Sequence, residues 1–419
     1  MTVQLQLDAD VAFADVVRLF IERGAGPVLG MDAVMHLARA GEETFTYVAE
    51  RSPGTAVRFT LDAKRHAGTL EVAFDGVAIS PGSFNLTFAV DLEDELQMDL
   101  PLLLAARSVD RFDLAIEPGD KVVIRLRRDR AYPPAAPVVP PVVAGEGPWR
   151  MEAGSAELLG YVGGVLAAAV DPALLPGFAR TPARLADMAA AGEVASVLAV
   201  NAAGQVGGVL LWLVEAGHKV IRFFGPYVLT TEGRAAVAEA LVDAFIGTVS
   251  RSQAHGLFSQ HVTEDLPGEY FEELGTLEGP GHPIPAVYRG LQEDHAAAVW
   301  ADPAIMPFLE QKHAELALGR EIRMVLPPVS GAAVLSVAFD RARGSASMRP
   351  ILAGTDAGAV VAAHVELLRD EAILLAVLDL GRPIDATFIP SLLGAGFVPR
   401  FVLPMAATGD VLVLQRSRV

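Results

Sequence analysis

The sequence contains no cysteine, and this absence removes several kinds of chemistry at once. Disulfide bonds, thiolate metal sites, iron–sulfur clusters and a cysteine nucleophile are all excluded. Basic residues are also scarce, because 33 Lys and Arg stand against 51 Asp and Glu, a formal net charge of −18. This balance opposes attraction to nucleic acid or to anionic lipid, so we expect neither as a partner.

No hydrophobic run in the sequence is long enough to cross a membrane. The longest, Leu158–Val170, falls short of the roughly 20 residues that a membrane-spanning helix needs. The N-terminus, MTVQLQLDADV, is acidic where a signal peptide carries positive charge. We therefore expect a cytoplasmic protein without a membrane span.

Length and composition predict several folded domains. The chain has 419 residues, of which 52% are hydrophobic, and a single core stops growing at roughly 250–300 residues. Six prolines in the stretch 131–148 predict an extended linker that tethers the first domain to the rest of the chain. A second Gly- and Pro-rich stretch, GPGHPIP at 279–285, marks a weaker boundary. We therefore predict domains over 1–130, 149–285 and 286–419.

Residues 1–130 have the pattern of a two-layer α+β sandwich. A first helix, ending at Gly24, is predicted from four apolar residues spaced i, i+3, i+4 and i+7: Phe13, Val16, Val17 and Phe20. A second helix covers 34–48, and alternating apolar residues over 57–74 predict an antiparallel hairpin. A third helix begins near Asp99 and precedes a second hairpin over 112–126.

This segment resembles the ATP-binding fold of anti-sigma-factor serine kinases, relatives of the histidine-kinase ATPase domain. The similar stretches are EETFTYVAE at 42–50, FDGVAISP at 74–81 and DLPLLLAARSVDRF at 99–112. The resemblance implies a degenerate ATP site at Glu43, Tyr47, Asp75 and Gly76, in which Tyr47 replaces the family's Mg²⁺-binding asparagine and Phe74 its adenine-reading aspartate. A triphosphate needs a metal ligand and a glycine-rich lid, so we do not expect ATP or Mg²⁺ to bind.

The middle segment has the order helix, helix, three strands, a four-turn helix over 237–248, a strand over 257–262 and a helix over 269–274. This order resembles the GNAT acyltransferase fold. The resemblance places the coenzyme A pyrophosphate loop, at a helix N-terminus, on Val228, Gly233, Arg234, Ala235 and Ala236. Gly233 replaces the family's Arg or Gln, and Arg234 replaces its next glycine. The phosphate cradle is therefore altered, although Arg234 could supply a positive charge.

The catalytic residues of the GNAT family have no direct counterpart in this segment. The family's general-acid tyrosine aligns with Phe271, and Tyr270 is its neighbour. Tyr270, Glu215 and His218 are the candidate acid and base groups, and His261 is a further candidate base; each can also be an ordinary polar residue of a loop or strand end. His261 lies near Glu264 and Asp265, but without a second histidine at helical spacing we predict no metal site.

Residues 286–419 resemble a GNAT-related half-domain, with SLLGAGF at 391–397 placed like the family's last helix and Gly-Phe turn. The predicted fold class is thus α+β and α/β: a histidine-kinase-ATPase-like sandwich, a Pro-rich linker, a GNAT-like mixed sheet and a second, GNAT-like half-domain. Two hypotheses for function remain. One is an acyl-CoA-dependent N-acyltransferase acting on a small amine or a protein, with flanking regulatory modules. The other is a non-catalytic regulatory or assembly protein, a pseudoenzyme that binds a protein partner through its degenerate folds. The sequence leaves the oligomeric state open.

Overall fold

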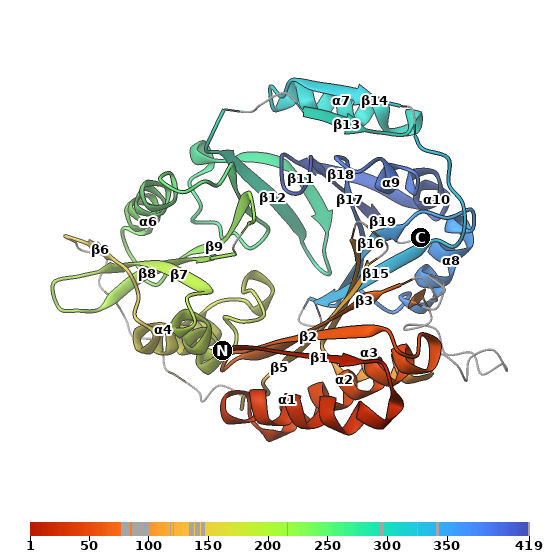
Figure 1. Cartoon of the computed structure of the whole chain (residues 1–419). Helices are drawn as coiled ribbons and strands as arrows, with labels where there is room; N and C mark the ends of the chain where they lie inside the picture. The colour runs from red at the N-terminus through yellow and green to blue at the C-terminus, as the bar shows by residue number, and fades with distance from the viewer. Residues whose placement is uncertain are drawn as a thin grey trace.

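The computed structural model describes residues 1–76, 84–85, 100–117, 119, 121–133, 138, 143, 147–215, 217–293, 297–324, 326–340 and 343–417. In this part of the chain, three large sheets and one two-stranded sheet define an N-terminal, a middle and a C-terminal module. Figure 1 shows the modules, coloured from red through green to blue, arranged around a common centre. None of the described helices combines the length and the apolar character needed to cross a bilayer.

The N-terminal module is the expected α+β sandwich. Its five strands form an antiparallel sheet in the order β1-β2-β3-β5-β4, and the helices pack on one face of it. The elements are β1 (Thr2–Asp8), α1 (Ala14–Leu29), α2 (Met31–Arg51), β2 (Ala56–Ala63), β3 (Ala67–Asp75), α3 (Leu100–Ser108), β4 (Arg111–Glu117) and β5 (Lys121–Asp129). Strand β1, which the sequence analysis did not predict, pairs along its whole length with β2. Asp99, where the third helix was expected to begin, lies outside the described residues.

Helix α1 differs from the prediction in its end and in its buried face. It continues past Gly24 and is terminated by Gly30, whose φ is 91°. Gly24 is a packing position, because a Cβ there would lie 2.6 Å from a side-chain carbon of Leu61 on β2. The buried residues are spaced by four: Val17, Ile21, Ala25 and Leu29. Phe13, which precedes the helix as its N-cap, is exposed, and so is Val16, which lies on the side of the helix that points away from the sheet.

The middle module is a seven-stranded mixed sheet in the order β11-β12-β10-β9-β8-β7-β6. Its elements are β6 (Arg150–Glu152), α4 (Ala156–Ala169), α5 (Pro182–Ala190), β7 (Val194–Val200), β8 (Val206–Leu213), β9 (Val220–Val228), α6 (Arg234–Val249), β10 (Gly256–Ser259), β11 (Glu272–Glu278) and β12 (Pro283–Gly290). Strands β9 and β10 are parallel, and their neighbours pair antiparallel. Helices α4 and α5 cover one face of the sheet and α6 covers the other.

Two predictions at the end of the middle module are wrong. The expected helix over 269–274 is a single 3-10 turn, Gly268–Tyr270, followed by β11. The predicted domain boundary at 285 falls inside β12. Pro283 and Pro285 are tolerated in this strand because that part of β12 pairs only with β11, which leaves one side of the backbone without ladder partners.

The linker is not a free tether. Val143 is fully buried and forms a parallel β-bridge with Thr230 of the middle module. Val138 lies against helix α4, since a Cβ on Gly164 would be 3.1 Å from its side chain. The described linker residues therefore pack along the middle module, and the prediction of a tethered first domain is wrong.

The C-terminal module repeats the strand order of the middle one. Its elements are β13 (Ala297–Trp300), α7 (Met306–Glu315), β14 (Arg320–Arg323), β15 (Val334–Asp340), β16 (Ser345–Leu352), α8 (Ala357–Leu367), β17 (Ile373–Asp379), α9 (Pro383–Ala386), α10 (Ile389–Gly394), β18 (Phe397–Leu403) and β19 (Val411–Arg416). The order β15-β16-β17-β19-β18 matches β8-β9-β10-β12-β11. In both sheets, the parallel pair is joined by a helix, α8 or α6.

A buried ion-pair network docks the unpredicted β13-α7-β14 unit onto this module. Arg320 of β14 donates hydrogen bonds of 2.8 and 3.0 Å to the two carboxylate oxygens of Asp410, and both side chains are fully buried. His313 Nε2 of α7 lies 3.2 Å from the same carboxylate. Although burial raises the pKa of Asp410, the hydrogen bonds from His313 and Arg320 outweigh it and hold this pKa below its usual range.

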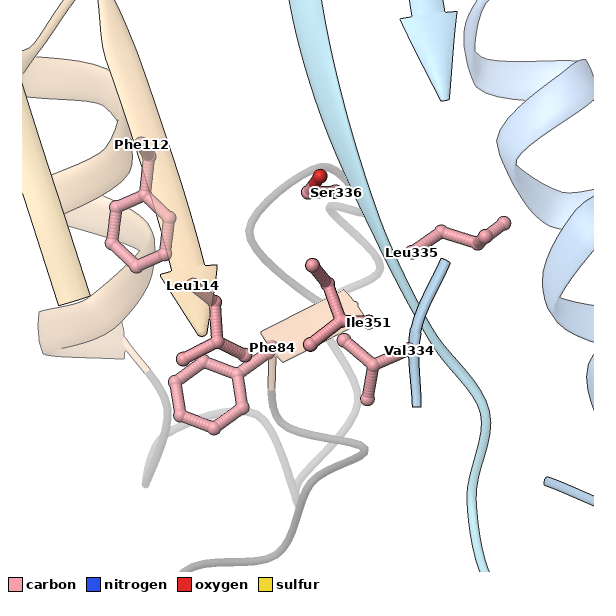
Figure 2. Close-up of a pocket in the computed structure, with 7 residues that line it drawn as sticks. All are labelled: Phe84, Phe112, Leu114, Val334, Leu335, Ser336 and Ile351. Carbon is pink, nitrogen blue, oxygen red and sulfur yellow. The ribbon is translucent and has the colours of Figure 1, made fainter. Parts of the chain in front are cut away.

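The N-terminal and C-terminal modules meet along the edges of their sheets. The Asn85 side chain donates to the carbonyl of Ala333 at 2.5 Å and accepts from the N–H of Leu335 at 3.1 Å, as a neighbouring strand would. Figure 2 shows the apolar side chains at this junction around a small pocket, lined by Phe84, Phe112, Leu114, Val334, Leu335, Ser336 and Ile351. Strand β4 thus lies beside β15 and β16.

Strands β11 and β18 join the middle and C-terminal modules. A Cβ on Gly275 would lie 2.4 Å from the carbonyl oxygen of Arg400, so the two backbones touch at this point. The Gln415 side chain accepts from the N–H of Glu278 at 2.8 Å and donates to its carbonyl at 2.7 Å. Residues of both sheets share one apolar core, which includes Leu274 and Phe401.

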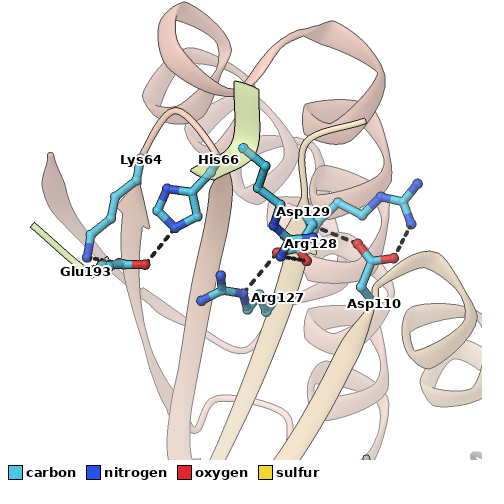
Figure 3. Close-up of polar contacts among 8 residues, drawn as sticks. Lys64, His66, Asp110, Arg127, Arg128, Asp129 and Glu193 are labelled. Carbon is cyan, nitrogen blue, oxygen red and sulfur yellow. Dashed lines mark hydrogen bonds and ion pairs between the residues drawn. The ribbon is translucent and has the colours of Figure 1, made fainter. Parts of the chain in front are cut away.

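The N-terminal and middle modules meet through charged side chains, shown in part in Figure 3. Glu193 lies between Lys64 and the fully buried His66, whose Nε2 is 2.7 Å from its carboxylate. Arg184 of α5 donates a hydrogen bond of 2.5 Å to Asp129, the last residue of β5. Each module therefore contacts both of the others, and the three form a closed ring.

Candidate functional site

The parallel strands β9 and β10 diverge after a short paired stretch. Pairing covers only Val220–Arg222 and Gly256–Phe258. Beyond it, the register between β8 and β9 shifts at Gly225-Pro226, which form a bulge in β9. Gly225 has a φ of 94°, a conformation that a residue with a side chain rarely adopts. The rest of β9 therefore presents a backbone edge that β10 does not cover.

Residues 259–263 of the same chain cover this edge. The Gly225 N–H donates to the carbonyl of His261 at 2.9 Å. The Ser259 hydroxyl donates to the carbonyl of Phe223, and the Thr263 hydroxyl to that of Pro226, each at 2.6 Å. These backbone groups of β9 are thus hydrogen-bonded to the chain itself. We call residues 259–265 the closing segment.

The closing segment also reaches the predicted pyrophosphate loop. Gly233 is the N-cap of α6 in a left-handed conformation, and Arg234 is the first helical residue. The Arg234 guanidinium donates to both carboxylate oxygens of Asp265, at 2.9 and 2.5 Å, and to the carbonyl of Thr230 at 2.9 Å. The Asp265 carboxylate therefore already pairs with the Arg234 guanidinium, the positive charge that a phosphate at this helix N-terminus would need. Ala235 and Ala236 are exposed.

Val228, the first residue of the predicted coenzyme loop, is the last residue of β9. It is buried in the core beneath α6 and pairs with Gly208 of β8. The backbone of Val228 is therefore part of the β8–β9 pairing that resumes after the bulge at Gly225-Pro226.

The three predicted catalytic residues do not form one site. Glu215 and His218 lie together in the β8–β9 turn, 3.6 Å apart, and Glu215 accepts hydrogen bonds of 2.6 and 3.2 Å from Arg222. Tyr270 lies on the α6 side of the sheet, where a hydrogen bond to Asp243 raises the pKa of its hydroxyl. Among the described residues, no contact joins Tyr270 to Glu215 or His218.

Phe271, at the position of the family's catalytic tyrosine, is a packing residue. Its ring stacks on Phe223 with centroids 4.9 Å apart and planes inclined by 29°. Phe223 is fully buried beneath α6. A phenyl ring in this stack has no proton to donate.

His261 is surrounded by positive charge. Burial, followed by the charges of Arg343, Arg180 and Arg222, lowers the pKa of its imidazole to about 2. It is therefore neutral at physiological pH and a weak base. Arg343, from the turn between β15 and β16, donates to the carbonyl of Gln260 at 2.7 Å and to that of Ala173 at 3.4 Å. The C-terminal module thus holds the closing segment in place.

Of the four residues of the predicted degenerate ATP site, only Tyr47 lies in the core of the N-terminal module. Tyr47 and Phe74 are both buried, and the guanidinium of Arg51 lies 4.9 Å from the centroid of the Tyr47 ring. Burial raises the pKa of Glu43 on α2. Asp75 is exposed at the end of β3 and Gly76 follows it, while 77–81 of the similar stretch lie outside the described residues.

Sequence analysis missed the residues that connect these parts. Ser259, Thr263 and Arg343 belong to no recognisable sequence motif. Asp265 was considered only as a neighbour of His261, where no metal site was predicted. The described residues contain no group of three or more His, Asp or Glu side chains placed to hold a metal ion.

Comparisons with known proteins find similarity of fold. No family model matches the sequence, and no curated protein matches it either. A GNAT-family acetyltransferase structure from Desulfovibrio desulfuricans aligns with 35% of this chain and 100% of its own, at 15% identity and a TM-score of 0.28. An acetyltransferase structure from Acinetobacter baylyi aligns with 35% of this chain and 93% of its own, at 17% identity and a TM-score of 0.28. The structure of mutant forms of the spermidine/spermine N-acetyltransferase of Vibrio cholerae aligns with 34% of this chain and 95% of its own, at 10% identity and a TM-score of 0.25.

Proposed function

We propose that this protein is a non-catalytic regulatory or assembly protein, in which a GNAT-like fold serves as a framework for binding a protein partner. The observation that carries the proposal is the closure of β9 by the chain itself. Gly225, the backbone amide at the bulge, already donates to His261. An acyl thioester needs such an amide to polarise its carbonyl, so the closed edge removes a part that acyl transfer requires.

Three further contacts support this proposal. Asp265 neutralises Arg234 at the N-terminus of α6. Phe271 replaces a proton donor with a stacked phenyl ring. Arg343 ties the closing segment to the C-terminal module, so opening the edge would also disturb a contact between modules.

The second candidate function is an acyl-CoA-dependent N-acyltransferase, favoured by the exposed start of α6. Ala235 and Ala236 are exposed there beside Arg234, as the resemblance to the coenzyme loop requires. On this hypothesis the coenzyme displaces Asp265, and its pyrophosphate takes over the Arg234 guanidinium and the helix dipole.

Calorimetric titration of the full chain with acetyl-CoA separates the two functions. We expect no binding heat at millimolar coenzyme, and no transfer of an acetyl group to spermidine in a parallel assay. Asp265→Ala should also fail to bind, because Ser259, His261 and Thr263 still close β9. Glu264→Ala, which removes an exposed neighbouring carboxylate, is the matched control. Saturable binding that Arg234→Ala weakens would support the acyltransferase instead.

A further inference from the structure

Arginines from all three modules lie near one another where the modules meet. They are Arg111 on β4, Arg180 before α5, Arg222 on β9, Arg343 in the β15–β16 turn and Arg349 on β16, and we call them the arginine cluster. Arg180, Arg222 and Arg343 surround His261, and Arg222 and Arg111 both act on Arg349. Arg222 therefore connects the two halves of the cluster.

The contacts between modules bring these residues together. Strand β4 lies beside β15 and β16, and across that junction the charge of Arg111 acts on Arg349. The turn that carries Arg343 reaches the middle module, where it contacts Gln260 and Ala173. Figure 1 shows β16 and β9 on facing sides of the common centre. The cluster exists only because the ring is closed.

Two of the five guanidiniums are available to a ligand. In the part of the chain that the structure describes, Arg111 and Arg349 make no hydrogen bond or ion pair through their side chains, and both are exposed. Arg349 nevertheless has a lowered pKa, first because of burial, although the carboxylates of Asp113 and Asp385 act in the opposite direction. Neighbouring groups therefore partly shield the guanidinium of Arg349, although the residue as a whole is exposed.

The charge pattern of the chain makes this cluster unusual. The protein has a net charge of −18, yet Arg111 and Arg222 lie near enough to Arg349 for their charges to act on it. Like charges at short range cost free energy unless a counter-charge joins them. Asp113 and Asp385 supply carboxylates near Arg349, and the carboxylate of Glu215 is engaged by Arg222. The guanidiniums of Arg111 and Arg349 have the planar donor arrangement that matches a carboxylate or a phosphate.

We propose that the arginine cluster is a binding site for a small oxyanion, a carboxylate- or phosphate-bearing ligand, held by Arg111 and Arg349 at the junction of the three modules. This site lies apart from the predicted coenzyme loop and does not depend on whether acyl-CoA binds. A ligand there would contact residues of more than one module and so stabilise the closed ring.

The test is calorimetric titration of the full chain at low ionic strength, with citrate and inorganic phosphate as separate arms. We expect saturable binding of at least one anion, and the arm that binds more tightly identifies the ligand as a carboxylate or a phosphate. Arg349→Gln and Arg111→Gln should each weaken binding about tenfold or more, the effect of losing one charge-assisted hydrogen bond. Arg251→Gln, an exposed arginine at the end of α6, should bind like the wild type.

Other outcomes would overturn the proposal. One is that neither anion binds saturably. Another is that Arg349→Gln and Arg111→Gln both bind the anion as tightly as the wild type. A third is that Arg251→Gln loses as much affinity as they do. Loss of binding in Arg234→Gln alone would place the anion at α6 instead. Without ligand, Arg349→Gln should have a thermal midpoint no lower than the wild type, because it removes a like charge. If that variant does not fold, Arg349→Lys serves in its place, and an unchanged affinity for the carboxylate in this variant would contradict a bidentate contact.

Discussion

Replacing Glu193 with glutamine tests how firmly the N-terminal and middle modules are joined. The substitution keeps the shape of the side chain and removes its charge, which leaves the fully buried His66 without its carboxylate partner. Burial alone would raise the pKa of Glu193, but hydrogen bonds from His66 and Lys64 outweigh it and bring this pKa down to about 2. The carboxylate is therefore more stable in the folded protein than in the unfolded chain.

The size of the effect follows from that pKa. A fall of the Glu193 pKa from 4.5 to about 2 corresponds to about 3 kcal/mol of folding free energy at neutral pH, since a change of one in the pKa is worth about 1.4 kcal/mol. The Lys64 side chain is 36% exposed, so screening by solvent reduces the part of this free energy that comes from Lys64. We therefore expect Glu193→Gln to destabilise the protein by about 2 kcal/mol at pH 7.

The assay is urea unfolding followed by the fluorescence of the tryptophans, two of which, Trp149 and Trp212, lie in the middle module. Because the folded pKa is depressed, the stabilisation is complete above about pH 4.5 and disappears as the pH falls towards 2. The difference between wild type and variant should therefore shrink over that range. Glu310→Gln, an exposed carboxylate on α7, is the control. Equal stability of Glu193→Gln and wild type at pH 7 would refute this reasoning.

Three further substitutions test the other contacts. Asp410→Asn should destabilise the protein by about 3–5 kcal/mol in a denaturant titration, because Arg320 would stay buried without its full counter-charge. Gly275→Ala should cost about 1–3 kcal/mol in the same titration, since its Cβ would lie 2.4 Å from the backbone oxygen of Arg400. Asn85→Ala removes two hydrogen bonds between modules and should speed limited proteolysis at that junction; an unchanged cleavage rate would show that the apolar contacts there suffice.

The sequence predicted most elements of the middle module because their patterns are local. A hairpin signal, Asn201 to Gly204, separates β7 from β8, and apolar residues at helical spacing mark α6. The same reasoning failed where a tertiary contact decided the outcome. Gly24 reads as a helix stop in sequence, but in the structure it makes room for Leu61. Pro283 and Pro285 read as a boundary, yet they lie where β12 has a single neighbour.

The candidate site shows the same limit. The altered phosphate loop and the replacement of the catalytic tyrosine by Phe271 were visible in the sequence. The pairing of Arg234 with Asp265 was not, because the choice of a partner 31 residues away depends on the path of the closing segment. The arginine cluster was also out of reach, since its members come from three modules and no spacing relates them.

Hydrogen exchange at the amide of Gly225 tests most directly whether the chain closes its own β9 edge. The hydrogen bond to the His261 carbonyl predicts that this amide is protected in the free protein. Millimolar acetyl-CoA should leave its exchange rate unchanged. Rapid exchange in the free protein, followed by protection when acetyl-CoA is added, would show that the edge is open and that the coenzyme occupies it.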